Sequence, residues 1–330
     1  MSEYRAARRP ARRTGEKSEP RRSGTQRSEP RRSGTPLRIS TRNAAFQQWH
    51  ALLGNRAKRQ RAGEFLIQGV RPLTLALDHD WPLSAVLHSA GGSGGRPLSR
   101  WARDTLDRVP AGVTRVDMDP ELLHELGGKE DTVPELLAVA RVPDDRLDRL
   151  TVGPDFLGVV FDRPITPGNI GTLIRSADAF GAHGVVVSGH AADIYDPKSL
   201  RASTGSLFAL PVVRVPSPQT VADWAAGLRT RGVPLRIVGT DERGAADLTG
   251  TDLTGPVLVV IGNETSGMSA AWRELCDETV RIPIGGAASS LNAAAAGTVL
   301  LYETQRQRGF PAVGAPVQAG VPVRVGGAGR

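Results

Sequence analysis

Three stretches in the second half of the chain place polar side chains directly after an apolar run. They are PGNIGTLIRSADAFG (167–181), IGNETSG (261–267) and IPIGGAASSLNAAAAG (282–297). The apolar runs that lead into them are rich in β-branched residues, which is typical of strands buried on both faces of a parallel sheet. Because ligands of such sheets gather at the carboxyl ends of the strands, the three stretches are candidates for one shared site.

The first stretch predicts a helix with a polar start. Asn169 is a favoured N-cap residue, and the N–H groups of an exposed helix start can bind a phosphate. Apolar residues recur at helical spacing from Ile170 to Phe180, and Gly181 is placed to end the helix. At about 100° per residue, Arg175 points away from this apolar stripe. It is either a solvated surface arginine or a cation that meets an anionic substrate.

The other two stretches combine small residues with isolated polar groups. Gly262 lets a ligand approach the backbone, and Glu264 puts a carboxylate at a strand end, although a plain polar turn is an equal alternative. In the third stretch, Ser289 and Ser290 are expected to cap a helix, with Asn292 in its first turn. The alanines that follow remove bulk, so either a ligand or another backbone comes near, or a good helix former simply packs tightly.

In this order and spacing, the three stretches resemble the motifs of the SpoU/TrmH family of RNA ribose 2′-O-methyltransferases, which belongs to the SPOUT group. The segment DPKSLRASTGSLFALPVV (196–213) is also similar to the family. The resemblance implies an α/β fold, in which a parallel-sheet domain with a trefoil knot follows a small L30e-like α/β domain. It further implies S-adenosyl-L-methionine as the cofactor, no metal, a homodimer, and RNA as the partner, with rRNA favoured over tRNA.

The resemblance also assigns residues to roles. The catalytic candidates that it implies are Asn169, Arg175, Glu264, Ser290 and Asn292. The cofactor-binding candidates are Thr240, Gly262, Ile282 and Leu291. Because a guanidinium stays protonated at ordinary pH, we expect Arg175 to bind the RNA phosphate and to stabilise the forming alkoxide rather than to act as the base. Glu264 is expected to orient Arg175 or Asn169, and Ser290 and Asn292 to contact ribose or phosphate.

Alternating strand and helix patterns predict two α/β domains with a tail at each end. Residues 1–42 form a basic tail with a repeated SEPRRSGT, which cannot bury a core and is expected to be disordered, and residues 309–330 are expected to be loose. Residues 43–143 form the small domain and begin with one helix over 45–63. Residues 151–308 form the catalytic domain, with strands in FLGVVF, GVVVSG, PLRIVG, PVLVVIG and ETVRIPI.

The net positive charge of the chain comes from its N-terminal tail. Residues 1–42 hold 13 Lys and Arg against 4 Glu, whereas the rest of the chain holds 29 basic and 30 acidic residues. Such a tail either keeps the chain soluble or contacts RNA through counterion release. The single cysteine, Cys276, fits a reducing compartment. Without a signal-peptide core or an apolar run near 20 residues, the expectation is a cytoplasmic protein with no membrane partner.

Two other classes of function are weighed against this one. A dinucleotide oxidoreductase is disfavoured, because no GxGxxG follows the first strand of either domain. A non-catalytic RNA-binding or ribosome-assembly protein stays open, because the tail and the small domain suit it. A methyltransferase of the same fold that acts on a base is a third alternative, and the third stretch favours ribose.

Overall fold

The computed structural model describes residues 37–89, 91, 97–128 and 133–310. The predicted tails therefore lie almost wholly outside the described residues. One part of the predicted N-terminal tail is described, and there the prediction was wrong. Leu37–Ile39 form strand β1, which pairs in parallel with β4 (Thr114–Met118). The folded chain thus begins before residue 43, because Ile39 is buried in the core of the small domain.

The small domain is built on a five-stranded mixed sheet with the order β1-β4-β3-β5-β2. Its further strands are β2 (Glu64–Gln68), β3 (Leu83–His88) and β5 (Leu136–Arg141). Strand β5 runs antiparallel to both β2 and β3, and the other pairs are parallel. The helices are α1 (Ala44–Gly54), α2 (Arg56–Ala62), α3 (Val70–Asp78), α4 (Arg100–Arg108) and α5 (Pro120–Gly127).

The single helix predicted over 45–63 is two helices. Asn55 separates α1 from α2, because its backbone is extended and its side chain accepts a hydrogen bond from the Lys58 N–H. An asparagine side chain that satisfies the first N–H groups of a helix favours a new start at that point. Within the second helix, Arg59 is buried, and its guanidinium donates to the Asp193 carboxylate at 2.7 Å. That pair connects α2 to the loop after β7.

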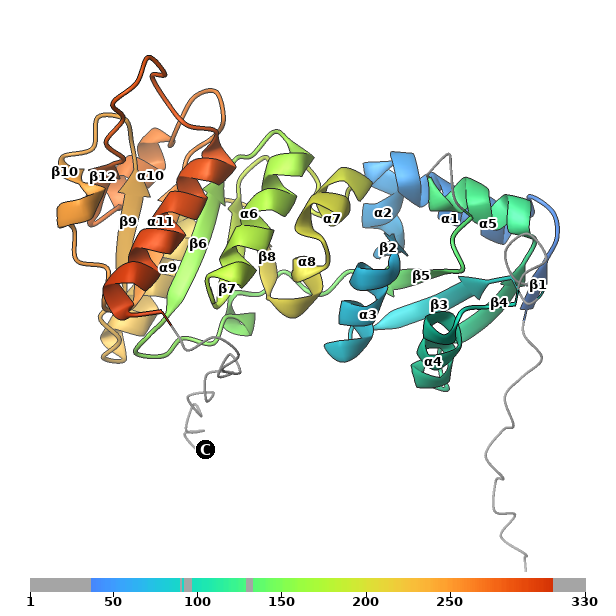
Figure 1. Ribbon diagram of the computed structural model, residues 1–330. Helices are drawn as coiled ribbons and strands as arrows, with labels where there is room; N and C mark the ends of the chain where they lie inside the picture. Colours follow the sequence, from blue (N-terminus) through green and yellow to red (C-terminus); the bar gives the residue numbers. More distant parts are fainter. Residues whose placement is uncertain (1–36, 90, 92–96, 129–132, 311–330) are drawn as a thin grey trace, which may run out of the picture. The chain divides into compact units, whose positions relative to one another are not determined.

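The second domain contains a seven-stranded sheet in which every pair is parallel, with the order β10-β12-β9-β11-β6-β7-β8 (Figure 1). The five predicted strands are present as β6 (Leu157–Asp162), β7 (Gly184–Ser188), β9 (Arg236–Thr240), β11 (Val257–Ile261) and β12 (Glu278–Arg281). Two further strands, β8 (Val212–Val215) and β10 (Ala246–Asp247), were not predicted.

Helices cover both faces of this sheet. They are α6 (Pro167–Ala179), α7 (Pro197–Ser203), α8 (Ser206–Ala209), α9 (Pro218–Thr230), α10 (Ala270–Leu275) and α11 (Ala293–Arg308). Alternate residues of the strands face opposite cores: Val159 and Phe161 share one with Leu173 of α6, whereas Val160 shares the other with Trp272 of α10. Figure 1 shows α11, α6 and α7 side by side along the chain's parallel sheet.

Helices α6 and α11 approach each other closely. A Cβ on Gly297 would lie 2.4 Å from the Leu173 side chain, and the hydroxyls of Ser176 and Thr298 are 2.7 Å apart. This contact holds the first and the third of the polar stretches together. No helix within the described ranges is long and apolar enough to cross a bilayer. The trefoil knot that the resemblance implies stays a prediction.

Candidate active site at the carboxyl ends of the parallel strands

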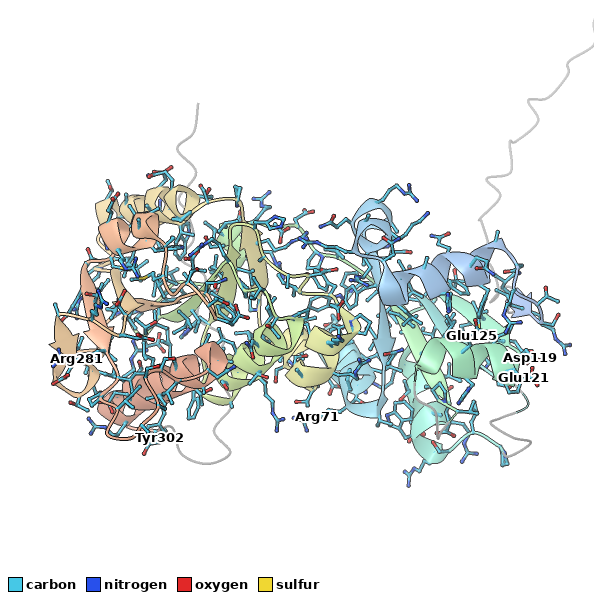
Figure 2. All side chains as sticks on the ribbon, turned by 90° about the horizontal axis from the view of Figure 1, so that it is seen from above. Arg71, Asp119, Glu121, Glu125, Arg281 and Tyr302 are labelled. Carbon is cyan, nitrogen blue, oxygen red and sulfur yellow. The ribbon has the colours of Figure 1, made fainter. Side chains whose placement is uncertain are left out.

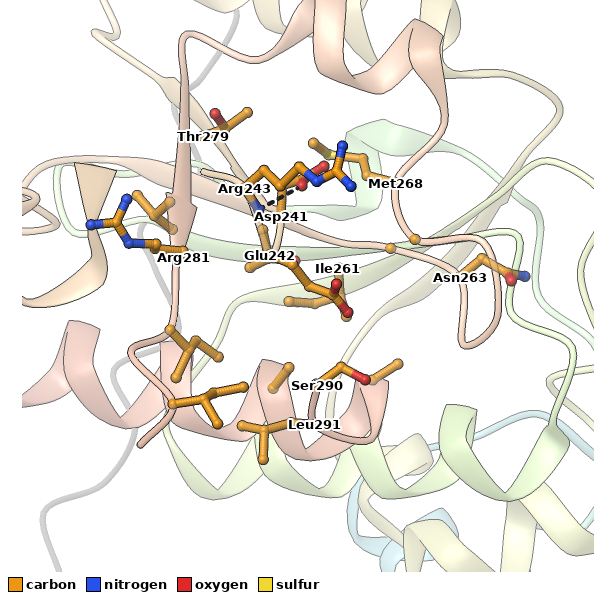
Figure 3. A pocket seen from close by; sticks show the side chains of 18 of the residues that line it. Asp241, Glu242, Arg243, Ile261, Asn263, Met268, Thr279, Arg281, Ser290 and Leu291 are labelled. Atoms are coloured by element: carbon orange, nitrogen blue, oxygen red, sulfur yellow. Dashed lines mark hydrogen bonds between the residues drawn. The ribbon is translucent and has the colours of Figure 1, made fainter. Parts of the chain in front are cut away.

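A cleft of about 1220 Å³ opens at the carboxyl edge of the large sheet (Figure 3). It is lined by parts of the segments 240–247, 261–268, 279–284 and 289–296, and by Arg273. The four predicted cofactor-binding residues all line it: Thr240, Gly262, Ile282 and Leu291. So do two of the predicted catalytic residues, Glu264 and Ser290. These six positions lie between residues 240 and 291 of the sequence, and the fold brings them together around the cleft.

A chain of hydrogen bonds joins the three polar stretches to one another. Asn169 Nδ2 donates to Glu264 Oε1 at 3.1 Å, and Asn292 Nδ2 donates to Asn169 Oδ1 at 3.2 Å. Residues that lie 95 and 123 positions apart in the sequence therefore form one connected group, which we call the polar relay. In this group both amide nitrogens donate, and the acceptors are a carboxylate oxygen and an amide oxygen, so the two hydrogen bonds are compatible with each other.

Glu264 has a more specific role than the sequence suggested. Its two carboxylate oxygens accept the backbone N–H groups of Ile165 and Thr166, each at 3.0 Å, in addition to Asn169. The carboxylate therefore occupies the N-terminal end of α6, where the helix dipole favours a negative charge. Partial burial opposes ionisation, but the donors from Ile165, Asn169 and Thr166 together hold the pKa of Glu264 below its usual value. Glu264 is thus an anion that fixes the start of the helix.

The prediction that Asn169 caps the first helix was wrong. Helix α6 begins at Pro167, Thr166 is its N-cap, and Asn169 lies within its first turn. Proline is favoured at the first helical position because it lacks the N–H group that has no partner there. The missing cap is replaced from outside the helix by Glu264. At the other end, Gly181 has φ +65° and follows the last helical turn, as predicted.

The third stretch also starts its helix later than predicted. Asn292 is the N-cap of α11, because its Oδ1 accepts the N–H groups of Ala294 and Ala295 at 2.9 and 3.2 Å. Ser289 and Ser290 do not cap the helix and lie in the exposed loop that lines the cleft. One asparagine therefore does two tasks, since its oxygen caps α11 while its nitrogen belongs to the polar relay.

Arg175 is not part of the polar relay. Its side chain is exposed and makes no hydrogen bond or ion pair to any described residue. It lies about 9 Å along the helix axis from Asn169 and about 120° around it. Of the two partners expected for Glu264, the chain provides Asn169 and not Arg175. A single chain thus brings together Asn169, Glu264 and Asn292, and leaves Arg175 on the outer face of α6.

Gly262 is required by the turn that follows it. A Cβ at this position would lie 2.3 Å from the Met268 nitrogen and 2.5 Å from the Gly267 carbonyl carbon. The chain folds back here because Asn263 and Gly267 bond to each other through both backbone N–H groups. The sequence suggested that Gly262 makes room for a ligand, but the tight turn alone explains why a glycine is needed here. The residue does line the cleft.

An ion pair between a buried carboxylate and a partly exposed arginine, which the sequence did not predict, holds this turn in place. Asp162 ends β6 with 1% of its surface exposed, and Arg163 binds its carboxylate at 3.1 Å. Arg163 also donates to the Gly267 carbonyl, and Asp162 accepts the Ser269 N–H at 2.8 Å. Asn263 Nδ2 completes the contact by donating to the Arg163 carbonyl. The available signal was the charged pair directly after FLGVVF, at the same edge as the other polar tips.

Charged residues of the turn after β9, together with others on β10, α10 and β12, form another side of the cleft, and none of them was predicted. Asp241 Oδ2 accepts from Arg273 at 2.8 Å, and Arg281 pairs with Asp247 at 2.7 Å. Partial burial raises the pKa of Asp241, but hydrogen bonds from the Arg243 N–H and from Arg273 outweigh this effect. The pKa of Asp241 is therefore below its usual value. The cleft therefore combines an apolar part, made by Ile261, Ile282, Leu291, Ala293 and Ala296, with a strongly charged one.

Comparison with known proteins places the chain in a family. Residues 157–302 match the model of the SpoU rRNA Methylase family, and residues 43–138 match that of the SpoU L30e-like domain. A 23S rRNA (uridine(2479)-2′-O)-methyltransferase from Streptomyces viridochromogenes is 59% identical over 271 residues, which are 82% of this chain and 92% of that protein. The chain belongs to the SpoU methylase family, and the L30e-like character predicted for its first domain is confirmed.

Solved structures agree with this assignment. The crystal structure of the SpoU methyltransferase AviRb from Streptomyces viridochromogenes, in complex with the cofactor AdoMet, matches with a TM-score of 0.75 and 59% identity. The match covers 81% of this chain and 98% of that chain. An uncharacterised tRNA/rRNA methyltransferase from Mycobacterium avium is 39% identical over 167 residues, and this match spans only about half of each chain, 50% and 52%.

Proposed function

We propose that this protein transfers the methyl group of S-adenosyl-L-methionine to the 2′-hydroxyl of a ribose in 23S ribosomal RNA. The observation that carries the proposal is the polar relay, Glu264–Asn169–Asn292, at the edge of a cleft that contains the predicted cofactor residues. The high identity to a 23S rRNA 2′-O-methyltransferase over nearly its whole length supports the substrate class. An rRNA substrate also favours the cytoplasm as the place of action.

The cleft fits the cofactor chemically. S-adenosyl-L-methionine has a flat apolar adenine, a ribose and a charged amino-acid end, and its sulfonium supplies an electrophilic methyl group. Apolar side chains of Ile282 and Leu291 offer a surface to an aromatic ring, and Leu291 has 41% of its surface exposed although it is large and apolar. The Gly- and Ala-rich loops expose backbone groups that can bind the polar atoms of the nucleoside. The residues that would hold the cofactor are thus Thr240, Gly262, Ile282 and Leu291.

The protein's own part in the reaction is positioning and electrostatics. Asn169 is held at both ends of its amide, by Glu264 and by Asn292, so that it cannot rotate away from the site. Holding the sugar hydroxyl in line with the methyl group supplies much of the rate of such a transfer. Ser290 adds an exposed hydroxyl at the same cleft. A guanidinium from Arg175 would bind the neighbouring phosphate and stabilise the oxyanion as the hydroxyl proton passes to that phosphate or to water, and S-adenosyl-L-homocysteine would leave.

In a homodimer, Arg175 would reach the active site of the partner subunit. Within its own chain it lies on the outer face of α6, away from the polar relay. The outer face of α11 exposes Val299 and Tyr302, with 36% and 48% of their surfaces accessible, next to the exposed face of α6 (Tyr302 is labelled in Figure 2). Neighbouring exposed apolar side chains on one helix face offer a surface that a second copy can cover. A second copy that covers this face would carry its own Arg175 toward the first copy's cleft. Each site of the dimer would then combine the relay of one subunit with the arginine of the other.

The test is methyl transfer to ribosomal RNA with a mapped product. Purified protein is incubated with S-adenosyl-L-methionine carrying a labelled methyl group and with protein-free 23S rRNA, 16S rRNA or tRNA. The proposal expects label in 23S rRNA, at a ribose that resists alkaline cleavage. Label in tRNA alone, label on a base, or binding of RNA without any transfer contradicts it. Asn169→Ala serves as the inactive control.

A further inference from the structure

Two charged side chains in the cleft make no hydrogen bond or ion pair within the described residues, although Arg243 is close enough to Asp241 to stabilise its negative charge. Glu242 and Arg243 both line the cleft, both are exposed, and neither side chain makes a hydrogen bond or an ion pair to a described residue. They are neighbours in the turn after β9, which Figure 3 shows at one side of the cleft, with Ser290 and Leu291 at another.

The other charged groups of the cleft are neutralised in the protein itself. Arg273 is bound to Asp241 and Arg281 to Asp247, and Glu264 accepts three N–H donors. The Glu242 carboxylate and the Arg243 guanidinium, on adjacent residues, are the charged groups of the described cleft lining that make no direct hydrogen bond or ion pair. An exposed charge on a protein surface usually has water as its only partner, but two opposite charges side by side inside a ligand cleft match a ligand that carries both signs.

The turn that carries the pair has a fixed backbone. The Asp241 N–H donates to the Val280 carbonyl at 3.0 Å, and the Asp241 side chain accepts the Arg243 N–H at 2.9 Å. Gly244 ends the turn, and a Cβ there would lie 2.4 Å from the Val280 carbonyl carbon. The two side chains therefore start from a preorganised backbone, which lowers the entropy cost of holding a ligand between them.

We propose that Glu242 and Arg243 bind the amino-acid end of S-adenosyl-L-methionine. The Arg243 guanidinium pairs with the α-carboxylate of the cofactor, and the Glu242 carboxylate pairs with its α-ammonium group. The apolar part of the cleft, with Ile282 and Leu291, remains for the adenine. An RNA phosphate is the weaker candidate for the same pair, because Glu242 would repel it. This inference rests on the proposed function, in which S-adenosyl-L-methionine is the cofactor.

The test compares a ligand that carries the amino-acid end with one that lacks both this end and the sulfonium charge, and it is read from the effect of each variant on each ligand. Calorimetry measures the binding of S-adenosyl-L-methionine and of 5′-methylthioadenosine, which lacks the amino-acid end, to the full-length protein and to Arg243→Ala and Glu242→Gln. Each variant is expected to weaken S-adenosyl-L-methionine binding about tenfold, equivalent to one charge-assisted hydrogen bond, and to leave 5′-methylthioadenosine binding unchanged. Arg231→Ala, at the exposed C-terminal end of α9, is the matched control and should bind both ligands like the wild type.

The outcomes separate this inference from the function on which it rests. If the variants lose affinity for both ligands equally, or if neither changes the affinity for S-adenosyl-L-methionine, the inference is wrong while the cofactor stands. A variant with unchanged cofactor affinity and a raised KM for RNA would assign Arg243 to the phosphate instead, which also overturns it. If the wild type binds neither ligand, the cofactor assignment itself fails, and this inference fails with it.

Discussion

Asn169 and Arg175 lie on the same helix, but the protein treats them in opposite ways. Asn169 is held by hydrogen bonds from two other polar stretches, whereas Arg175, less than two turns further on, has no partner within the described chain. A group that must be in place before substrate arrives gains from fixed partners, since the cost of ordering it is met during folding. A group that meets a charged substrate or a second subunit has to keep its hydrogen-bonding capacity free.

The comparison also separates stability from chemistry. Loss of the relay removes hydrogen bonds that hold α6, β11 and α11 together, so such variants are expected to affect both folding and catalysis. Loss of Arg175 removes no contact within the chain and is expected to affect catalysis alone.

The largest effect is expected from Arg175→Ala. Because the guanidinium is proposed to bind the phosphate and to stabilise the oxyanion, methyl transfer should fall about 10² to 10³-fold. The melting temperature and the affinity for S-adenosyl-L-methionine should not change, since the side chain has no partner in the chain. Single-turnover kinetics and calorimetry measure the two quantities, with Arg231→Ala as the exposed control. Wild-type turnover in Arg175→Ala would remove this residue from the mechanism.

Glu264→Gln should affect both stability and activity. The new amide presents an NH₂ group to donors from Ile165, Thr166 and Asn169, so at least one contact becomes unfavourable. We expect a loss of about 1–3 kcal/mol in the free energy of unfolding and a fall in methyl transfer of about tenfold or more. Urea unfolding and activity assays measure these changes, and Glu274→Gln, an exposed site on α10 with no side-chain partner in the described chain, is the control.

The pH dependence of the same variant has a definite sign. The donors lower the pKa of Glu264 in the folded protein, against the opposing effect of partial burial. The carboxylate therefore stabilises the fold above the ordinary pKa of a glutamate, about 4.3, and this contribution is lost as the pH falls through the lower folded value. The stability difference between wild type and Glu264→Gln should be full at neutral pH and should shrink in acid. A difference that grows in acid would mean that Glu264 is not held as an anion.

The sequence predicted the members of the relay but not how they are joined. Asn169, Glu264 and Asn292 could be found because each follows a strand, and parallel strands end at one edge. Their local roles were misassigned, because Pro167 moves the helix start forward and the cap comes from Glu264, 98 residues away. The sequence did not predict the roles of two further charged pairs, Asp162 with Arg163 and Glu242 with Arg243. The reason is the same, because the partners of a charged side chain lie on turns that are distant in the sequence.

The same limit applies to the fold. Long apolar strands such as β6 and β11 were predicted, because burial on both faces leaves a continuous apolar run. The short edge strands β8 and β10 were missed, since Val212–Val215 includes a charged residue and Ala246–Asp247 has only two residues. Strand β1 was assigned to the tail for a related reason, because three residues in basic surroundings carry little pattern of their own.

A mixing experiment tests whether the free and the fixed groups come from different subunits. Arg175→Ala keeps the relay, and Glu264→Gln keeps the arginine, so a mixed dimer would contain one site with both. Random reassortment of equal amounts should then restore activity to about a quarter of the wild type, because half of the dimers carry one good site of two. The measurement is methyl transfer after refolding or co-expression of the two variants. No recovery, with dimers present by light scattering, would place Arg175 in the same chain's site or outside the reaction.

The smallest effect is expected from the basic N-terminal segment. Deletion should stop at residue 35, because β1 begins at Leu37 and Ile39 is part of the core. If the segment contacts RNA, its removal lowers RNA affinity and makes the plot of log affinity against log salt flatter, by about 0.7–0.9 for each lost phosphate contact. The affinity for S-adenosyl-L-methionine and the single-turnover rate at saturating RNA should stay the same. Filter binding over a range of salt concentrations measures the slope. An unchanged slope would show that Lys and Arg in this segment do not contact the RNA. The small domain and Arg175 would then have to bind the RNA instead.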